Sequence, residues 1–323
     1  MPLNEYSDYV SGLSKNIDEY HSILKMLDLN TEFKETLNNE IADILELGNG
    51  LLASVKKYLD GKPNAAYDIF ADVMNFLWKK IEVFKRSANQ DINTNCLYRI
   101  RKINEIELIQ AIDMFHIPFN ERHKVTNQRY SINGFPCLYL GSSVLSCWIE
   151  LGANANNRYA VSKFKIAENV EIFDLFINGN KEFDQSVESD NYWGNWVRET
   201  IMREIYLYQL LLACSFPSID DHPFRENYIV PQMLLEWIRS SSTIKGIKYK
   251  STKMLNKVRN SNLAMNYVFP PNESKGYGHC DYLKSLFGVS DPVTLTIRKN
   301  DNYNRKIVDI EKMLNEKKLF TIR

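Results

Sequence analysis

The sequence predicts an α+β protein in which an all-helical N-terminal module precedes a part that mixes strands and helices. Three observations predict this class. In residues 1–90, apolar side chains recur at helical spacing, as in Ile41, Ile44 and Leu45. After residue 95, short apolar runs bounded by Gly, Pro and Asn appear, which is typical of strands. Residues 85–95 between them are polar and indicate a linker. The chain therefore divides into residues 1–90 and 91–323.

End signals define the helices of the first part. Thr31 is predicted to cap a helix, and Glu35 lies in its first turn, where the helix dipole favours an acid. The segment Asp60-Gly61-Lys62-Pro63 predicts a helix end, because Gly ends helices and the following Pro cannot continue one. A further helix is expected over about Asn64–Phe84.

Strand and helix patterns alternate in the second part. Six short apolar runs predict strands: Cys96–Ile100, Phe135–Leu140, Ala160–Phe164, Val170–Leu175, Ile244–Tyr249 and Val293–Ile297. Four segments have helical spacing: about Ser143–Leu151, Trp196–Ala213, Pro231–Ser240 and Arg305–Lys317. This mixture is the pattern of an α+β domain.

Composition excludes several classes of function. Forty Lys and Arg residues balance forty Asp and Glu residues, which argues against a general nucleic-acid binder, because such proteins need a basic surface. No apolar run approaches the roughly 20 residues of a membrane span, and Met1–Glu5 does not begin a signal peptide. Five scattered cysteines fit reduced thiols better than a disulfide framework. We therefore expect a cytoplasmic protein without membrane or nucleic-acid partners.

The usual catalytic signatures are missing from the sequence. It has neither a phosphate-binding loop nor a Gly-x-Gly-x-x-Gly turn, a nucleophile elbow or a His-Glu-x-x-His helix. His279 and Cys280 follow a Gly-rich loop but lack a second ligand pair at zinc-site spacing, so no metal site is expected. His116 and His123 are interpreted as hydrogen-bonded structural histidines.

Residues 129–150 are the densest candidate for a functional site. Ser131–Gly134 predicts a turn between a strand that ends near residues 129–131 and the strand Phe135–Leu140. Gly141–Ser143 then opens a helix, on which Ser143, Ser146 and Glu150 lie on one stripe. The pattern alone favours a solvent-facing polar stripe. The alternative is a carboxylate aimed into a cleft, near an arginine and a tyrosine from the preceding hairpin.

A second candidate is the strand Ile244–Ser251, in which Ile247, Tyr249 and Ser251 share one face. Ser251 would project from an inward face at the end of the strand. Taken alone, such a hydroxyl more often hydrogen-bonds to the backbone.

Together these pieces resemble the signature of RES domains, a family named for its Arg, Glu and Ser. The matching elements occur in order along the chain: Leu97-Tyr98-Arg99, Arg129-Tyr130, Gly134, Tyr139-Leu140-Gly141-Ser142-Ser143, Glu150 and Gly246-Ile247-Lys248-Tyr249-Lys250-Ser251. The resemblance covers roughly Cys96 to Phe269 and leaves the helical residues 1–90 outside.

Two departures from the family pattern stand out. The family's frequent Arg-Trp-Asn is Arg129-Tyr130-Ser131 here, which removes an amide that would contact ligand. The family's frequent Tyr-Pro-Ser is Tyr249-Lys250-Ser251, which keeps the hydroxyl and changes only the rigidity of the strand.

The resemblance implies a fold and an activity. RES proteins are similar in fold to ADP-ribosyltransferase toxins, with a split β-core and peripheral helices. Known members are toxins of toxin–antitoxin pairs that destroy NAD+ by phosphorolysis or hydrolysis. For this chain the resemblance implies an NAD+ phosphorylase or glycohydrolase. NAD+ is then a substrate rather than a cofactor, inorganic phosphate is a candidate co-substrate, and an antitoxin or other regulatory protein is an expected partner.

The same resemblance assigns the site residues. Glu150 would stabilise positive charge at the ribose, or orient the ribose hydroxyls or the nucleophile. Arg129 would bind the pyrophosphate or inorganic phosphate. Tyr139 would stack on the pyridinium ring, and Ser251 would hydrogen-bond a ribose hydroxyl or a phosphate oxygen.

Further residues and the helical part have less defined roles. Arg99 and Ser143 complete the expected binding residues, and Arg101 is an alternative second phosphate contact; either arginine could equally brace a carboxylate. The helical residues 1–90 could cap the cleft, bind a regulator or form a homo-oligomer, although a packed scaffold is favoured over a switch.

Two other functions stay open at this point. The same cleft would serve an ADP-ribosyltransferase that modifies a macromolecule, and residue types do not separate the two activities. A non-catalytic interaction protein, with residues 1–90 as its working part, is disfavoured by the intact set Arg129, Tyr139, Glu150 and Ser251.

Overall fold

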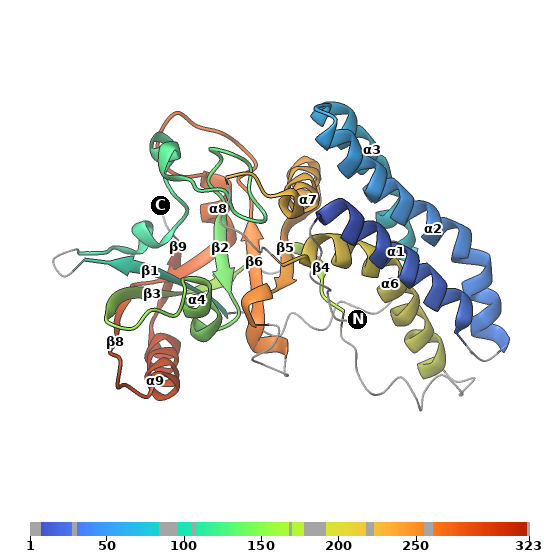
Figure 1. Cartoon of the computed structure of the whole chain (residues 1–323). Helices are drawn as coiled ribbons and strands as arrows, with labels where there is room; N and C mark the ends of the chain where they lie inside the picture. The colour runs from blue at the N-terminus through green and yellow to red at the C-terminus, as the bar shows by residue number, and fades with distance from the viewer. Residues whose placement is uncertain are drawn as a thin grey trace. The chain divides into compact units, whose positions relative to one another are not determined.

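A computed structural model describes residues 8–27, 31–83, 96–104, 108–167, 170–177, 192–217, 223–254 and 261–321. The predicted α+β class is confirmed: helices form the N-terminal part, and a mixed sheet follows (Figure 1). The chain forms two compact units. The first comprises residues 1–91 and 176–237, and the second comprises residues 92–175 and 238–323.

The described residues of the first unit form helices and no strands. Its elements are α1 (Tyr9–Met26), α2 (Thr31–Leu59), α3 (Pro63–Val83), α6 (Tyr192–Ser215), the 3-10 helix η4 (Glu226–Tyr228) and most of α7 (Ile229–Ser240). The predicted helix end between α2 and α3 is confirmed, because Gly61 has a φ of 76° and Pro63 begins α3. The helix predicted to follow Thr31 is present as α2, while the capping contact predicted for the Thr31 side chain lies outside what the structure describes.

The core of the first unit explains why α6 belongs to it. The helix α6 packs against α1, α2 and α3. The buried Gln209 of α6 hydrogen-bonds to His21 Nε2 of α1 at 2.9 Å and donates to the carbonyl of Ile44 in α2 at 2.6 Å. In addition, the Tyr9 hydroxyl donates to the carbonyl of Ala213 at 2.9 Å. These bonds satisfy polar groups that would otherwise be buried without partners.

The division of the chain thus differs from the one expected from the sequence. The boundary near residue 90 coincides with a boundary between the units, but residues 176–237 group with the helical unit rather than with the second part. The difference arises because α6 and α7 carry apolar helical patterns like those of residues 1–90, and no composition change marks residues 175 and 237 as boundaries.

The second unit is built on one mixed sheet. Within the described residues, nine strands follow the order β4-β5-β6-β2-β1-β3-β7-β9, with β8 also paired to β3. The strands are β1 (Cys96–Ile103), β2 (Leu138–Gly141), β3 (Asn157–Ile166), β4 (Glu171–Leu175), β5 (Ile244–Lys250), β6 (Met265–Phe269), β7 (Phe287–Ser290), β8 (Val293–Ile297) and β9 (Leu319–Thr321). The pair β4–β5 is parallel and the other pairs are antiparallel.

The sheet narrows at its centre. There β1 and β2 are joined by the register pair of Tyr98 with Gly141, whereas β1 pairs with β3 along its whole length. Figure 1 shows that β2, β6 and β5 run in a different direction from β1 and β3. The sheet is therefore two blocks of strands that meet at β1 and β2. Similarity to the ADP-ribosyltransferase fold stays a prediction.

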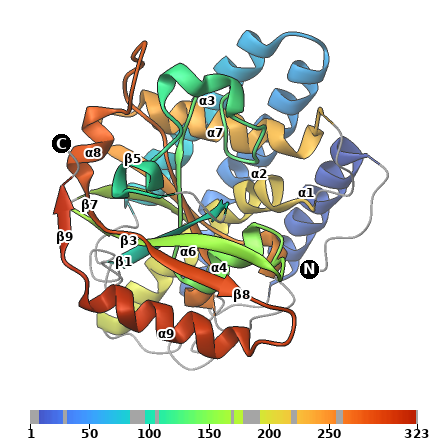
Figure 2. The same ribbon diagram turned by 90° about the vertical axis from the view of Figure 1, so that its left-hand side faces the viewer.

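Helices and short turns cover the sheet of the second unit. They are α4 (Val144–Glu150), α8 (Asp281–Leu286), α9 (Tyr303–Glu316) and the 3-10 helices η2 (Ala111–Met114), η3 (Phe119–Lys124), η5 (Thr252–Met254) and η6 (Ser261–Ala264). Buried residues of α4 and α9, including Trp148 and Leu314, form one apolar cluster with Tyr98 of β1 and Leu295 of β8. Figure 2 shows α9 running beside β8. This cluster fixes α4 against the junction of the two blocks.

Most predicted strands and helices of the second part are confirmed, with one clear correction. Residues 129–131 form a turn rather than the end of a strand, and the next strand begins at Leu138 instead of Phe135. The physical reason is Pro136, which has no N–H to donate to a sheet and so delays strand pairing. The tight turn itself is present, since Gly134 has a φ of 68° and Phe135 bridges Ile132.

Candidate functional site

The candidate site lies at the junction of the two blocks of strands and begins with the helix α4, which follows β2 directly. Its predicted cap is confirmed. The Ser143 hydroxyl accepts from the N–H of Ser146 at 3.0 Å, and Ser146 donates back to the carbonyl of Ser143 at 2.8 Å. The same Ser143 hydroxyl donates to the carbonyl of Leu263 at 2.8 Å. Ser143, which the sequence analysis placed among the ligand-binding residues, therefore serves to cap α4.

The interpretation of the helix as a solvent-facing polar stripe is wrong. Ser143 is 4% exposed and Ser146 is 0% exposed. The Ser146 hydroxyl hydrogen-bonds within the first turn, and the Ser143 hydroxyl bonds both to the first turn and to the carbonyl of Leu263. Only the last member of the stripe, Glu150, keeps a partly exposed side chain, with 33% of it accessible. The stripe therefore anchors the helix at one end and presents a carboxylate at the other.

Two neutral donors from other parts of the chain hold the Glu150 carboxylate. Ser251 Oγ donates to Glu150 Oε1 at 2.5 Å, and Asn266 Nδ2 donates to the same oxygen at 2.7 Å. Lys253 Nζ lies 3.7 Å from Glu150 Oε2 and donates to the backbone carbonyl of Glu150 at 2.7 Å. One oxygen is thus fixed by two hydrogen bonds, while the other faces a lysine whose side chain is 54% exposed.

The strands β5 and β6 explain why these donors meet the carboxylate. The two strands are antiparallel, and Tyr249 of β5 pairs with Asn266 of β6. Ser251 follows β5, is fully buried, and donates its N–H to the carbonyl of Ala264 at 2.9 Å. The predicted inward position of Ser251 at the strand end is thus what the structure shows. Its hydroxyl, however, bonds to a carboxylate and not to the backbone.

The tyrosine and arginine of the predicted site lie on the adjoining hairpin and strand. Tyr139 of β2 is partly buried, and its hydroxyl donates to the carbonyl of Tyr130 at 2.6 Å. Burial raises the pKa of Tyr139 well above its usual range. The ring of Tyr130 lies 4.3 Å from that of Tyr249, measured between centroids. Arg129, partly buried, directly precedes Tyr130. The hairpin is thereby attached to both β2 and β5.

Arg99 of β1, a partly buried residue, adds a positive charge at the same junction. Its Nη1 is buried and has no hydrogen-bond partner among the residues that the structure describes. Burial lowers the pKa of Arg99 to about 10, and the positive charge of Arg101 acts in the same direction. Burial likewise raises the pKa of Cys147 to about 12. A guanidinium with an N–H donor that has no partner is well suited to bind an anionic ligand.

The structure brings some predicted residues together and adds others. Glu150 and Ser251 are in direct contact. Tyr139 joins the hairpin that carries Arg129. Asn266 and Lys253 were not identified from the sequence. The signal that could have revealed Asn266 is its place inside the apolar run Met265–Phe269, because asparagine is depleted in strands and a buried amide needs a partner.

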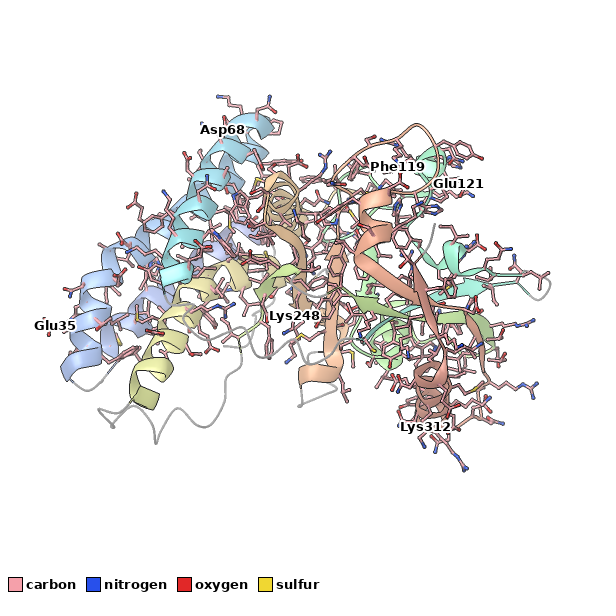
Figure 3. All side chains as sticks on the ribbon, turned by 180° about the vertical axis from the view of Figure 1, so that it is seen from behind. Glu35, Asp68, Phe119, Glu121, Lys248 and Lys312 are labelled. Carbon is pink, nitrogen blue, oxygen red and sulfur yellow. The ribbon has the colours of Figure 1, made fainter. Side chains whose placement is uncertain are left out.

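His116 is a hydrogen-bonded structural histidine, as predicted from the sequence. Its Nδ1 donates to the carbonyl of Ile117 at 2.7 Å, and its Nε2 accepts from the N–H of Cys280 at 2.9 Å. Burial lowers the pKa of His116 to about 4. Nearby, the N–H of Phe119 donates to the carbonyl of Gly278 at 2.7 Å, and Figure 3 shows Phe119 beside the loop that leads to α8. These contacts fix the loop that was considered for metal binding.

Within the described ranges, no group of three or more His, Cys, Asp and Glu side chains is arranged to hold a metal ion. In the same ranges, no helix is both long and apolar enough to cross a bilayer. A surface hollow of the second unit is lined by Ile109–Ile112, Asp291, Pro292, Phe320 and Thr321. This lining includes none of the site residues, so the site is defined by its contacts.

Comparison with known proteins gives one relative. No family model matches the chain, and no solved structure matches it. The chain is 33% identical over 270 residues to a protein of Bacillus subtilis (strain 168) named "Putative toxin YopC". The matched segment is 79% of this chain and 60% of that protein, so the chain spans about three fifths of its relative's length. Over most of its own length, the chain is thus a homologue of this Bacillus subtilis protein.

Proposed function

We propose that the chain is a toxin that degrades NAD+, by breaking the bond between nicotinamide and ribose through phosphorolysis or hydrolysis. The observation that carries the proposal is the contact of Glu150 with Ser251, at 2.5 Å across 101 residues of sequence. Two members of the RES signature, found far apart in the chain, therefore meet in one hydrogen bond.

The chemistry of the bond fits a carboxylate held in this way. Nicotinamide in NAD+ is cationic, so it leaves as a neutral molecule and requires no general acid. The bond breaks through a transition state with positive charge on the ribose, as in glycoside hydrolysis. A carboxylate that is already oriented stabilises this charge without reorganising, which is the condition for effective electrostatic catalysis. Glu150 is the residue proposed for this role.

The remaining residues are proposed to bind the two ends of the dinucleotide. Arg99, with its unsatisfied Nη1, and Arg129 would bind the pyrophosphate or an inorganic phosphate acting as nucleophile. Tyr139 would stack on the pyridinium ring, where a cation–π contact contributes about 0.5–2 kcal/mol. Ser251 would share its hydroxyl between Glu150 and a ribose hydroxyl or phosphate oxygen.

The relative supports the toxin part of the proposal. The Bacillus subtilis protein carries the word toxin in its name, and the aligned segment covers most of this chain. An enzyme that depletes NAD+ is toxic in any cell, because NAD+ is needed for central redox metabolism. Toxicity and NAD+ cleavage are therefore consistent with each other, and an antitoxin or other regulatory protein is the partner that such a toxin would need.

The direct test is release of nicotinamide from NAD+ by the purified protein. Wild type should release it, and parallel reactions with and without inorganic phosphate should identify the acceptor as phosphate or water. Glu150→Gln and Ser251→Ala should lower the rate, whereas Glu316→Gln, at an exposed position of α9, should not. Transfer of labelled ADP-ribose to a protein or nucleic acid, with little free product, would instead show an ADP-ribosyltransferase. Failure of NAD+ to react at all would contradict the proposal.

A further inference from the structure

Asn266, like Lys253, is a residue of the site that lies outside the family signature. It lies on β6, between β5 and β2, and it is 6% exposed. Its Nδ2 donates to Glu150 Oε1 at 2.7 Å, although the two residues are 116 positions apart. Burying an amide inside a strand is unfavourable unless the amide is hydrogen-bonded. The carboxylate of Glu150 supplies that bond.

Both neutral donors converge on the same carboxylate oxygen. Ser251 and Asn266 come from adjacent antiparallel strands, and each donates to Oε1 of Glu150. The sheet holds both donor residues in place. A carboxylate that accepts a hydrogen bond from each of them cannot rotate freely about its Cγ–Cδ bond. The second oxygen of Glu150, Oε2, lies 3.7 Å from Lys253 Nζ, and the Glu150 side chain is partly exposed. The two oxygens of Glu150 therefore have different surroundings.

We propose that Asn266 is a positioning residue, which together with Ser251 fixes Oε1 of Glu150 so that Oε2 is the oxygen presented to the substrate. This inference rests on the proposed cleavage of NAD+. In it, Asn266 never touches the dinucleotide. It keeps the carboxylate oriented, since its amide donates to one oxygen from a position that the sheet fixes. Lys253 is displaced from Oε2 when the cationic substrate arrives.

Removing the donor should slow the reaction more than it weakens substrate binding. A hydrogen bond to a charged group contributes about 1.5–3 kcal/mol, so Asn266→Ala should lower kcat for nicotinamide release about 10- to 100-fold, with KM changed little. The matched control is Asn227→Ala. Asn227 is also a buried asparagine, 8% exposed, and it donates to the carbonyls of Phe216 and Pro217 in the first unit. This control should leave kcat unchanged.

The isosteric variant Asn266→Asp gives a readout that a merely structural residue would not move. A second carboxylate beside Glu150 disfavours its charged form. The acid limb of the pH–rate profile should therefore move to higher pH in Asn266→Asp and stay in place in Asn227→Asp. A kcat equal to wild type in folded Asn266→Ala, or an unshifted acid limb in Asn266→Asp, would overturn the inference while leaving NAD+ cleavage intact.

A double-mutant cycle tests the contact without any activity. Asn266→Ala should reduce thermal stability more in the wild-type background than in Glu150→Gln, because the bond to a charged acceptor is the stronger one. Asn227→Ala should cost the same in both backgrounds. If the stability effects of the two substitutions are coupled but the protein releases no nicotinamide, the proposed function is rejected. The contact between Asn266 and Glu150 then still stands. Strict additivity at Asn266 would overturn the positioning role.

Discussion

Glu150 is held mainly by neutral donors, and the magnitudes of the interactions explain why. The ion pair with Lys253 joins a half-exposed lysine to a partly exposed carboxylate at 3.7 Å, and such surface pairs contribute about 0–1 kcal/mol. The hydrogen bonds from Ser251 and Asn266 are shorter and come from buried residues. Each hydrogen bond to a charged group contributes about 1.5–3 kcal/mol. Ser251 and Asn266 therefore contribute more than Lys253 to holding the Glu150 carboxylate in position.

His116 gives a residue-scale prediction about stability. It is 1% exposed, and burial lowers its pKa to about 4 from an unfolded value near 6.5. Between pH 4 and pH 6.5 the unfolded chain therefore binds more protons than the folded chain. The stability that neutral His116 contributes is fully present above pH 6.5 and is lost as the pH falls toward 4. The loss amounts to at most about 3 kcal/mol, since one pKa unit is 1.36 kcal/mol.

The measurement is the free energy of unfolding of wild type and His116→Gln between pH 7 and pH 4. The difference between the two proteins should shrink as the pH falls, because only wild type has this buried neutral histidine to protonate. His123→Gln, at an exposed position, serves as the control and should follow wild type throughout. If the free energies of unfolding of wild type and His116→Gln changed with pH in parallel, His116 would not take up a proton on unfolding, which would contradict the prediction.

The helix α4 is the element on which the site depends, and it is too short to be stable alone. It has 7 residues, whereas isolated helices below about 12 residues are marginal in water. Its N-terminus is fixed from two sides: Ser143 caps it, and Glu311 of α9 accepts from the N–H of Val144 at 2.8 Å. Burial raises the pKa of Glu311. Tertiary contacts, rather than helix propensity, therefore place Glu150.

The cap of α4 gives the prediction at the scale of the element. Ser143→Ala should cost about 1–2 kcal/mol of stability, which is the usual cost of losing an N-cap, and should also lower the rate of nicotinamide release, since α4 carries Glu150. Asp8 caps α1 of the first unit in the same way, with its side chain accepting from the N–H of Val10 at 3.0 Å. Asp8→Ala should cost similar stability and leave the rate unchanged. Equal rates in both variants would contradict a role of the cap in the site.

Elements with a clear hydrophobic period could be predicted from the sequence, and the others could not. The strands β1, β3, β5 and β8 and the helices α4, α6 and α9 were all expected near their observed positions. The strand β6 was missed because Asn266 interrupts its apolar run, and β9 was missed because three residues are too few to show a pattern. Asn266 could not be assigned to the site for the same reason. Only the pairing of β5 with β6 brings it to Glu150.

At the scale of the whole molecule, three segments of one unit meet at one carboxylate. The helix α4 supplies Glu150, the end of β5 supplies Ser251, and β6 supplies Asn266, while Arg99 and Tyr139 lie on the adjoining strands β1 and β2. The family signature predicted all of these residues except Asn266 from the sequence. It could not predict the grouping of residues 176–237 with the helical unit, which depends on buried contacts such as those of Gln209.

The central claim, that this site destroys NAD+, is tested most directly inside cells. Intracellular NAD+ should be measured after induced expression of wild type and of Glu150→Gln at matched protein levels. The account predicts that NAD+ falls steeply and growth stops with wild type, while both stay at the level of uninduced cells with Glu150→Gln. Growth arrest at unchanged NAD+, or equal loss of NAD+ with the two proteins, would contradict it.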